Sequence, residues 1–134
     1  MTEHPDVALV RRGYEAFNKG DMETLASLLT ADCTHHVPGD HQLSGHHKGR
    51  DKVLAMYARL AELTHGTFSL DLHDVFTDGR GHVISVYTTR ADRGNRGLEM
   101  RGGIFFTIIG GKVSDLDECI ADIDEANAFF GQEE

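Results

Sequence analysis

The 134-residue sequence has no tryptophan, two prolines and two cysteines. The cysteines, Cys33 and Cys119, stand far apart and form no CxxC motif. We therefore interpret them as small buried residues in a reducing compartment, not as a disulfide or a metal site.

Basic residues are also scarce, with 13 Lys and Arg against 22 Asp and Glu and a formal net charge of −9. Without a basic stripe, nucleic acid and anionic membrane surfaces are poor partners. No apolar run is long enough to span a membrane, and the first 14 residues lack the hydrophobic segment of a signal peptide. These features predict a cytoplasmic protein.

What is present is an ordinary globular composition, 40% hydrophobic and 26% charged, in a length that suits one domain over residues 1–134. Apolar residues at helical spacing predict three helices in the first half. The first runs from Val7 to Phe17, the second starts after its cap Asp21 and ends at Ala31-Asp32, and the third spans Arg50 to Leu63. Cys33 to Val37 is a candidate short strand, and His41 to Gly49 is expected to be a loop.

The second half changes to a period of two, which is typical of strands. A final helical turn or two is expected near the end of the chain. The predicted strands are Phe68 to His73, His82 to Arg90, Leu98 to Ile109 and Lys112 to Ile120, and the helical tail is Asp122 to Phe130. Helices followed by an antiparallel meander indicate the α+β class.

The stretch from Gly102 to Ile120 is a predicted hairpin, because Gly110-Gly111 favours a two-residue turn. Alternation puts Ser114, Leu116, Glu118 and Ile120 on one face of the return strand and Val113, Asp115, Asp117 and Cys119 on the other. A carboxylate between Leu116 and Ile120 on a covered face suggests that this face lines a pocket. Because the preceding strand is apolar on both faces, we expect a homodimer through the sheet.

Several short motifs follow one another in a characteristic order: Tyr14 to Asp21, Leu25 to Asp32, His36 to Gly39, Ser44-Gly45, Gly49-Arg50, Gly110 to Val113 and Asp122. Their order resembles the nuclear transport factor 2-like (NTF2-like) superfamily, and within it the SnoaL-like polyketide cyclases and ketosteroid isomerase-like proteins. The resemblance implies a cone, in which three N-terminal helices pack in a curved, mostly antiparallel sheet of four to five strands. It also implies an apolar pocket and frequent homodimers.

The isomerase members of this superfamily use a carboxylate base and two oxyanion donors. Carried over by motif, these three positions fall on Val37, Gly13 and Gly103, so that machinery is absent here. A supporting tyrosine is matched by Tyr57, with Met56 beside it as pocket wall.

The SnoaL-like cyclases carry an acid/base aspartate on the last strand, and the resemblance puts Glu118 at that position. Glu118 is then a candidate general acid/base in an apolar pocket. The alternative is a solvated strand carboxylate, because a register slip of one residue would exchange Glu118 with Asp117.

Other candidate site residues follow from the strand faces on which they lie and from the family resemblance. His35 shares the face of Val37 and could pair with Glu118 or polarise a carbonyl, or be a hydrogen-bonded core histidine. Tyr14 and Tyr57 are candidate catalytic hydrogen-bond donors, or core residues whose hydroxyls reach water at the mouth of the pocket. The candidate ligand-binding residues are Phe17, Val37, Met56, Arg101, Phe105, Leu116 and Ile120, although Arg101 could instead form a rim salt bridge with Glu99.

A zinc site among His35, His36, His41, His46 and His47 is disfavoured. Adjacent strand histidines point to opposite faces, and the loop spacing matches no helix-borne zinc motif. No metal is therefore expected.

Two functions stay open. The first is a cofactor-independent enzyme, an isomerase or cyclase more than a hydrolase, in which Glu118 shuttles a proton on an apolar carbonyl substrate while His35, Tyr57 or Tyr14 binds the enolate oxygen. The second is a non-catalytic dimeric module that binds a small lipophilic ligand.

Overall fold

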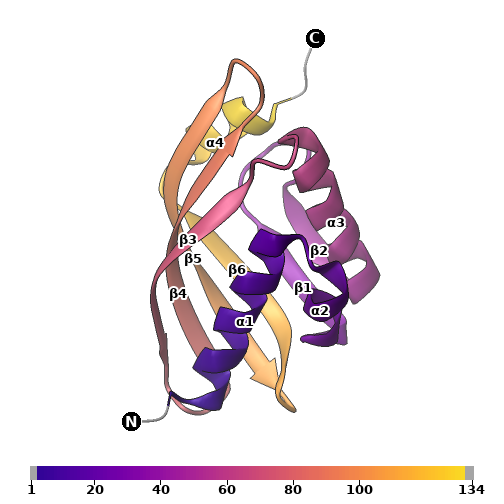
Figure 1. Ribbon diagram of the computed structural model, residues 1–134, viewed down its shortest axis with the longest axis vertical. Helices are drawn as coiled ribbons and strands as arrows, with labels where there is room; N and C mark the ends of the chain where they lie inside the picture. The colour runs from indigo at the N-terminus through magenta and orange to yellow at the C-terminus, as the bar shows by residue number, and fades with distance from the viewer. Residues whose placement is uncertain (1–2, 132–134) are drawn as a thin grey trace.

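A computed structural model describes residues 3–131 and shows a curved sheet whose concave side is lined by helices (Figure 1). The elements are α1 (Pro5–Lys19), α2 (Met22–Ser27), β1 (Leu29–Val37), β2 (Gly45–Lys48), α3 (Arg50–Leu63), β3 (Ser69–Thr77), β4 (His82–Asp92), β5 (Gly97–Ile109), β6 (Lys112–Ile120) and α4 (Ile123–Phe130). The strand order is β2-β1-β6-β5-β4-β3, and only the β1–β6 pairing is parallel among the described residues. The α+β class is confirmed.

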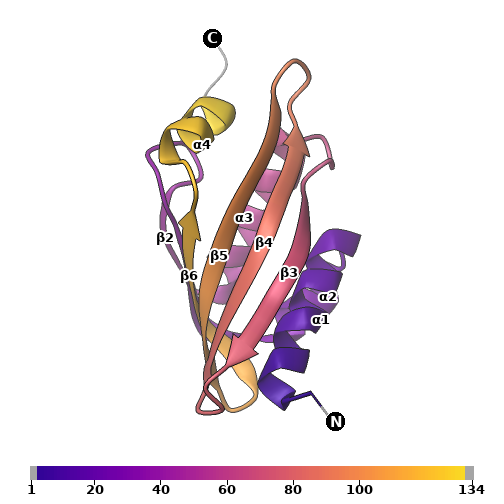
Figure 2. The same ribbon diagram turned by 90° about the vertical axis from the view of Figure 1, so that its left-hand side faces the viewer.

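Local sequence signals explain where the helices begin and end. Pro5 opens α1, and Gly20 closes it in the left-handed conformation. The side chains of Asp21 and Asp122 accept hydrogen bonds from backbone N–H groups in the first turns of α2 and α4. In the rotated view of Figure 2, α1 and α2 lie beside the sheet, and α4 lies at the end of the sheet away from the N-terminus.

The predicted strand count was too low, because the structure has six strands among its described residues, whereas its fourth helix, α4, falls on the predicted helical tail. The segment expected to be a loop contains β2, which pairs with β1 at the edge of the sheet. Its sequence, Gly-His-His-Lys, has no apolar alternation because it covers no core. Leu29, expected in the second helix, instead begins β1 and pairs with Val113 of β6.

The β5–β6 hairpin has the predicted Gly110-Gly111 turn, with φ values of 59° and 78°. A bulge follows, because Thr107 pairs with Asp115 and Ile108 with Val113, leaving Ser114 as an extra residue. The face prediction was therefore wrong for Val113, which is buried on the inner side with Leu116. Beyond the bulge the alternation holds, so Glu118 lies on the inner side as expected.

The core fills the space between the concave face of the sheet and the helices. Among residues 3–131, no helix is long and apolar enough to cross a membrane. The buried residues that surround the candidate site are Leu9, Val10, Tyr14, Met56, Tyr57, Leu60, Val83, Tyr87, Ile104, Phe106 and Leu116.

Candidate active site

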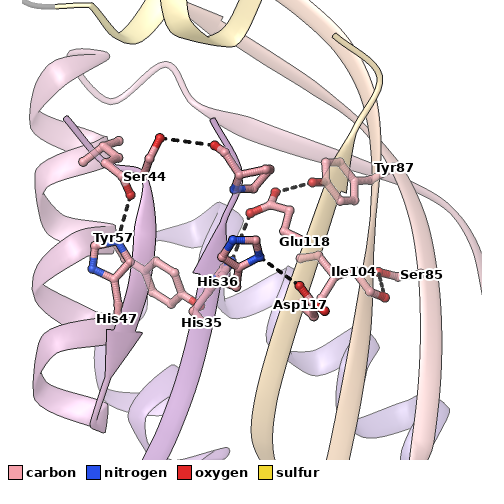
Figure 3. A network of polar contacts seen from close by, with 12 residues as sticks. His35, His36, Ser44, His47, Tyr57, Ser85, Tyr87, Ile104, Asp117 and Glu118 are labelled. Atoms are coloured by element: carbon pink, nitrogen blue, oxygen red, sulfur yellow. Dashed lines mark hydrogen bonds and ion pairs between the residues drawn. The ribbon is translucent and has the colours of Figure 1, made fainter. Parts of the chain in front are cut away.

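Glu118 is a mostly buried carboxylate held by side chains from two other strands (Figure 3). Its side chain is 18% exposed, and that of His35 on β1 is 7% exposed. His35 Nε2 lies 3.0 Å from Glu118 Oε1, and the Tyr87 hydroxyl of β4 donates a hydrogen bond to Oε2. Both carboxylate oxygens are thus engaged, as expected for an ion held inside a protein.

The contacts of His35 indicate which nitrogen carries its proton. Its Nδ1 lies 2.8 Å from the Tyr57 hydroxyl on α3. A carboxylate oxygen only accepts, so in the neutral imidazole the proton is on Nε2 and is donated to Glu118, which leaves Nδ1 as an acceptor. Burial first, and then the charge of Glu118, raise the pKa of Tyr57 well above its ordinary value, so its hydroxyl keeps its proton and can donate it to Nδ1. The result is a directed chain from Tyr57 through His35 to Glu118.

Tyr14 and Tyr87 belong to the same polar group. Burial is the main cause that raises the pKa of each phenol, so both remain protonated. The Tyr14 hydroxyl lies 2.7 Å from Ser85 Oγ, and either group can donate in that bond. The rings of Tyr14 and Tyr87 stand 6.1 Å apart between centroids. Four hydroxyl or imidazole donors therefore surround one carboxylate inside an apolar core.

A cavity of about 90 Å³ opens beside this group, between α1, α2, α3 and the sheet. Tyr14, His35, Tyr57 and Glu118 contribute polar groups to a wall that is otherwise apolar. The structure brings all four predicted catalytic residues to this cavity. The predicted ligand-binding residues Phe17, Met56 and Leu116 also line it.

A second cavity of about 60 Å³ lies on the side of Glu118 that faces α4. It contains two further predicted ligand-binding residues, Val37 and Ile120. Four residues line both cavities, so the two spaces meet at the carboxylate: Met56, Leu60, Phe68 and Glu118.

Arg101 and Phe105 do not line either cavity, so their predicted place in the pocket is wrong. Both are exposed on the outer face of β5, where Phe105 pairs in register with Ile84 and Asp117. Arg101 has no ion pair with Glu99, which binds Arg90 at 3.0 Å instead. The error has a physical reason: from Ile104 to Ile109, β5 is apolar on both faces, so hydropathy alone does not show which face of this part is covered.

Sequence reasoning missed Tyr87 as a partner of Glu118, although a signal was present. Glycine inside a strand often marks a close approach by another group. Gly102 pairs with Tyr87 on one side and Ile120 on the other, and a Cβ at position 102 would lie 2.7 Å from the Tyr87 hydroxyl. The missing side chain leaves the space through which Tyr87 reaches Glu118.

The other four histidines of the segment from His35 to His47 form no hydrogen bond with Glu118, His35 or the tyrosines. His36 points to the outer face, where it binds Asp117 at 3.0 Å and stacks on His46. His41 lines the second cavity against Phe130, and His47 binds the Leu43 carbonyl. Within residues 3–131, no three His, Cys, Asp or Glu side chains are grouped so that they could hold a metal ion.

Comparisons with known proteins show the family of the chain. A family model described as SnoaL-like domain matches residues 10–116. An uncharacterized protein of Mycobacterium tuberculosis is 37% identical over 130 residues, which is 97% of this chain and 99% of that protein. The chain belongs to the SnoaL-like domain family.

Two solved structures show the same fold. The structure of Bal32a, from a soil-derived mobile gene cassette, superposes with a TM-score of 0.92 at 36% identity, over 94% of this chain and 96% of the other. An NTF2-like protein from Burkholderia xenovorans gives a TM-score of 0.77 at 22% identity, over 96% and 98% of the two chains. The fold is therefore NTF2-like, with six strands and four helices in the described part of the chain.

Proposed function

We propose that this protein is an enzyme of the isomerase or cyclase type that transfers a proton on a small apolar carbonyl compound. One observation carries the proposal: the Glu118 carboxylate stands at the wall of an apolar cavity with hydrogen-bond donors on both of its oxygens. Among the polar groups at the cavity, Glu118 is the one that can take a proton from carbon, because the phenols keep theirs and His35 Nδ1 already accepts from Tyr57.

In the first step, Glu118 removes a proton from a carbon next to the carbonyl, and the C–H electron pair forms the enolate. The protonated Glu118 then returns the proton to a different carbon or to oxygen, so the enzyme ends as it began. His35 and Tyr87 hold the carboxyl group in place through both states. This chemistry needs no cofactor.

The enolate oxygen needs a hydrogen-bond donor, and Tyr14 is the best candidate. Tyr57 donates to His35, and His35 donates to Glu118, so neither proton is available. The bond between Tyr14 and Ser85 can run in either direction. When Ser85 donates, the Tyr14 proton is free to point into the cavity that Tyr14 lines.

The test uses exchange of carbon-bound protons with solvent, which requires no knowledge of the natural substrate. Wild-type protein in D₂O should accelerate deuterium incorporation next to the carbonyl of octan-2-one, followed by ¹H NMR. Glu118→Gln keeps the shape of the side chain but cannot accept the proton, and should slow the exchange by roughly 10²- to 10⁴-fold. The matched control is Asp117→Asn, on the outer face of the same strand. Equal exchange rates in wild type and Glu118→Gln would rule out the proposed role.

A second candidate function is a non-catalytic module that binds a small lipophilic ligand. The observation that favours it is the loss of the isomerase groups, because the three corresponding positions are Gly13, Val37 and Gly103. This function predicts saturable ligand binding by wild type without any acceleration of exchange.

We also propose that two copies pair through the outer face of the sheet. Phe76, Ile84 and Phe105 form one row across β3, β4 and β5, and each is exposed. Such a row of apolar side chains is unusual on a monomer surface. Sedimentation equilibrium should give twice the mass of one chain, and Phe105→Glu should give a single-chain mass. A wild-type mass of one chain would exclude this dimer.

The composition and the two free cysteines lead us to propose a cytoplasmic location. Fractionation of the native cells tests this, and recovery of the protein outside the cytoplasm would contradict it.

A further inference from the structure

The cavity next to α4 has a feature that the proposed chemistry does not use. Thr89 of β4 lies on the inner face, is 7% exposed and lines this second cavity. Within the described part of the chain, its hydroxyl has no hydrogen-bond partner. Its neighbour Thr88 differs, because it faces outward and binds His73 Nε2 at 2.7 Å. The Thr89 hydroxyl is not among the fully buried atoms that lack a hydrogen bond, so it is open to the cavity, where an oxygen of a ligand can bind it.

Each of the two inner cavities is small on its own. They hold about 90 Å³ and about 60 Å³, whereas an engineered cavity that binds benzene measures roughly 150 Å³. Neither space alone reaches that size. Both inner cavities border Glu118, so a ligand larger than a few atoms that approaches the carboxylate from the inner side of the sheet extends past it into both spaces.

The strand geometry gives the spacing of the polar contacts. Tyr87, which binds Glu118, and Thr89 are successive inward residues of β4. Inward residues of a strand are about 7 Å apart. A ligand whose reacting carbon lies at Glu118 therefore reaches Thr89 with an atom several bonds further along its chain.

We propose that the cavity next to α4 is a second subsite, which binds the far end of an elongated ligand through a hydrogen bond between Thr89 and an oxygen on that end. The substrate class is then a chain or single ring with a carbonyl near one end and a hydroxyl or carbonyl oxygen near the other. This inference rests on the proposed function for the placement of the reacting carbon, but binding alone tests it.

The experiment compares three ketones by isothermal titration. Butan-2-one is small enough for the first cavity, octan-2-one spans both, and 7-hydroxyheptan-2-one has the same number of heavy atoms as octan-2-one with a hydroxyl at the far end. Wild type should bind the hydroxyketone more tightly than octan-2-one. Thr89→Val should weaken hydroxyketone binding by roughly two- to tenfold and leave butan-2-one binding unchanged, since one neutral hydrogen bond is lost. The matched control is Thr88→Val, which should change the binding of neither the hydroxyketone nor butan-2-one.

Leu98→Trp provides a second test, because Leu98 lines only the second of these two cavities. The larger side chain should weaken octan-2-one binding at least about tenfold and spare butan-2-one. If the tryptophan variant does not fold, the Thr89→Val comparison decides. Equal effects of Thr89→Val on all three ketones, no wild-type preference for the hydroxyketone, or no saturable binding of either long ketone would overturn the subsite. If wild type shows these binding preferences but does not accelerate deuterium exchange, the result would instead count against the proposed chemistry.

Discussion

Two adjacent carboxylates on β6 form the same kind of pair and differ almost only in where they point. Glu118 binds His35 and Asp117 binds His36, each at 3.0 Å and each with a histidine of β1. The Glu118 side chain is 18% exposed and that of Asp117 is 62% exposed. The inner pair has two further tyrosine partners, while the outer pair has a stacked histidine in solvent. The strand alternation thus places one carboxylate–histidine contact in a candidate site and the other on the surface.

The difference teaches that burial, more than the carboxylate–histidine contact itself, makes such a pair a candidate for catalysis. In water an ion pair contributes little to stability and is screened by salt. Inside the cone, each donor that is removed leaves another polar group unsatisfied. Experiments that treat the two faces alike should therefore give very different results.

The largest difference should appear at alkaline pH, because all three tyrosines of the chain are on the inner side. Burial raises the pKa of Tyr14, Tyr57 and Tyr87 in the folded protein above the ordinary value near 10. Their contribution to stability is complete below pH ~10 and is lost above it, because only the unfolded chain ionises them. The free energy of unfolding should fall by about 4 kcal/mol per pH unit once the unfolded phenols are fully ionised.

Absorbance and circular dichroism measured in parallel check this alkaline transition. Tyrosinate absorbance should rise only as the protein unfolds. A phenol that titrates near pH 10 while the circular dichroism stays native would show that at least one tyrosine is accessible to solvent.

The next largest difference should come from removing each histidine. His35→Ala leaves Glu118 and Tyr57 in the interior without that partner, and should lower the unfolding free energy by about 3 kcal/mol. His36→Ala removes an exposed partner of Asp117 and should change the unfolding free energy by less than about 1 kcal/mol. Urea unfolding of the two variants measures the contrast, and equal losses would mean that the inner pair is as solvated as the outer one.

The smallest difference concerns the space that β5 leaves for Tyr87. A Cβ at Gly102 would lie 2.7 Å from the Tyr87 hydroxyl and 3.0 Å from the Cys119 carbonyl oxygen. Gly102→Ala should therefore cost about 1–3 kcal/mol and displace Tyr87 from Glu118. Gly97→Ala, on the same strand, meets nothing within 4 Å and serves as the control. The midpoint of urea unfolding for each variant tests this. An unchanged midpoint for Gly102→Ala would show that the Tyr87 side chain can adopt another position at no cost in stability.

Much of the fold could be predicted because its signals are local. Helical spacing located α1 and α3, and Gly110-Gly111 located the hairpin. The strand β2 was not predicted because an edge strand needs no apolar face. The bulge at Ser114 was not predicted because it depends on pairing with β5. Faces were predicted correctly where polar and apolar residues alternate, as at Leu116, Glu118 and Ile120, and incorrectly at Phe105, where they do not.

By itself, the sequence determined that a carboxylate would lie on the inner face of the last strand, because a strand turns alternate side chains to opposite sides. Its periodicities and turn residues also determined the α+β class. Only the tertiary structure decided what surrounds Glu118: the parallel pairing of β1 with β6 brings His35, and the space at Gly102 admits Tyr87 from β4. Contacts between strands so distant in the chain depend on how the whole sheet closes, and no local pattern of residues encodes that closure.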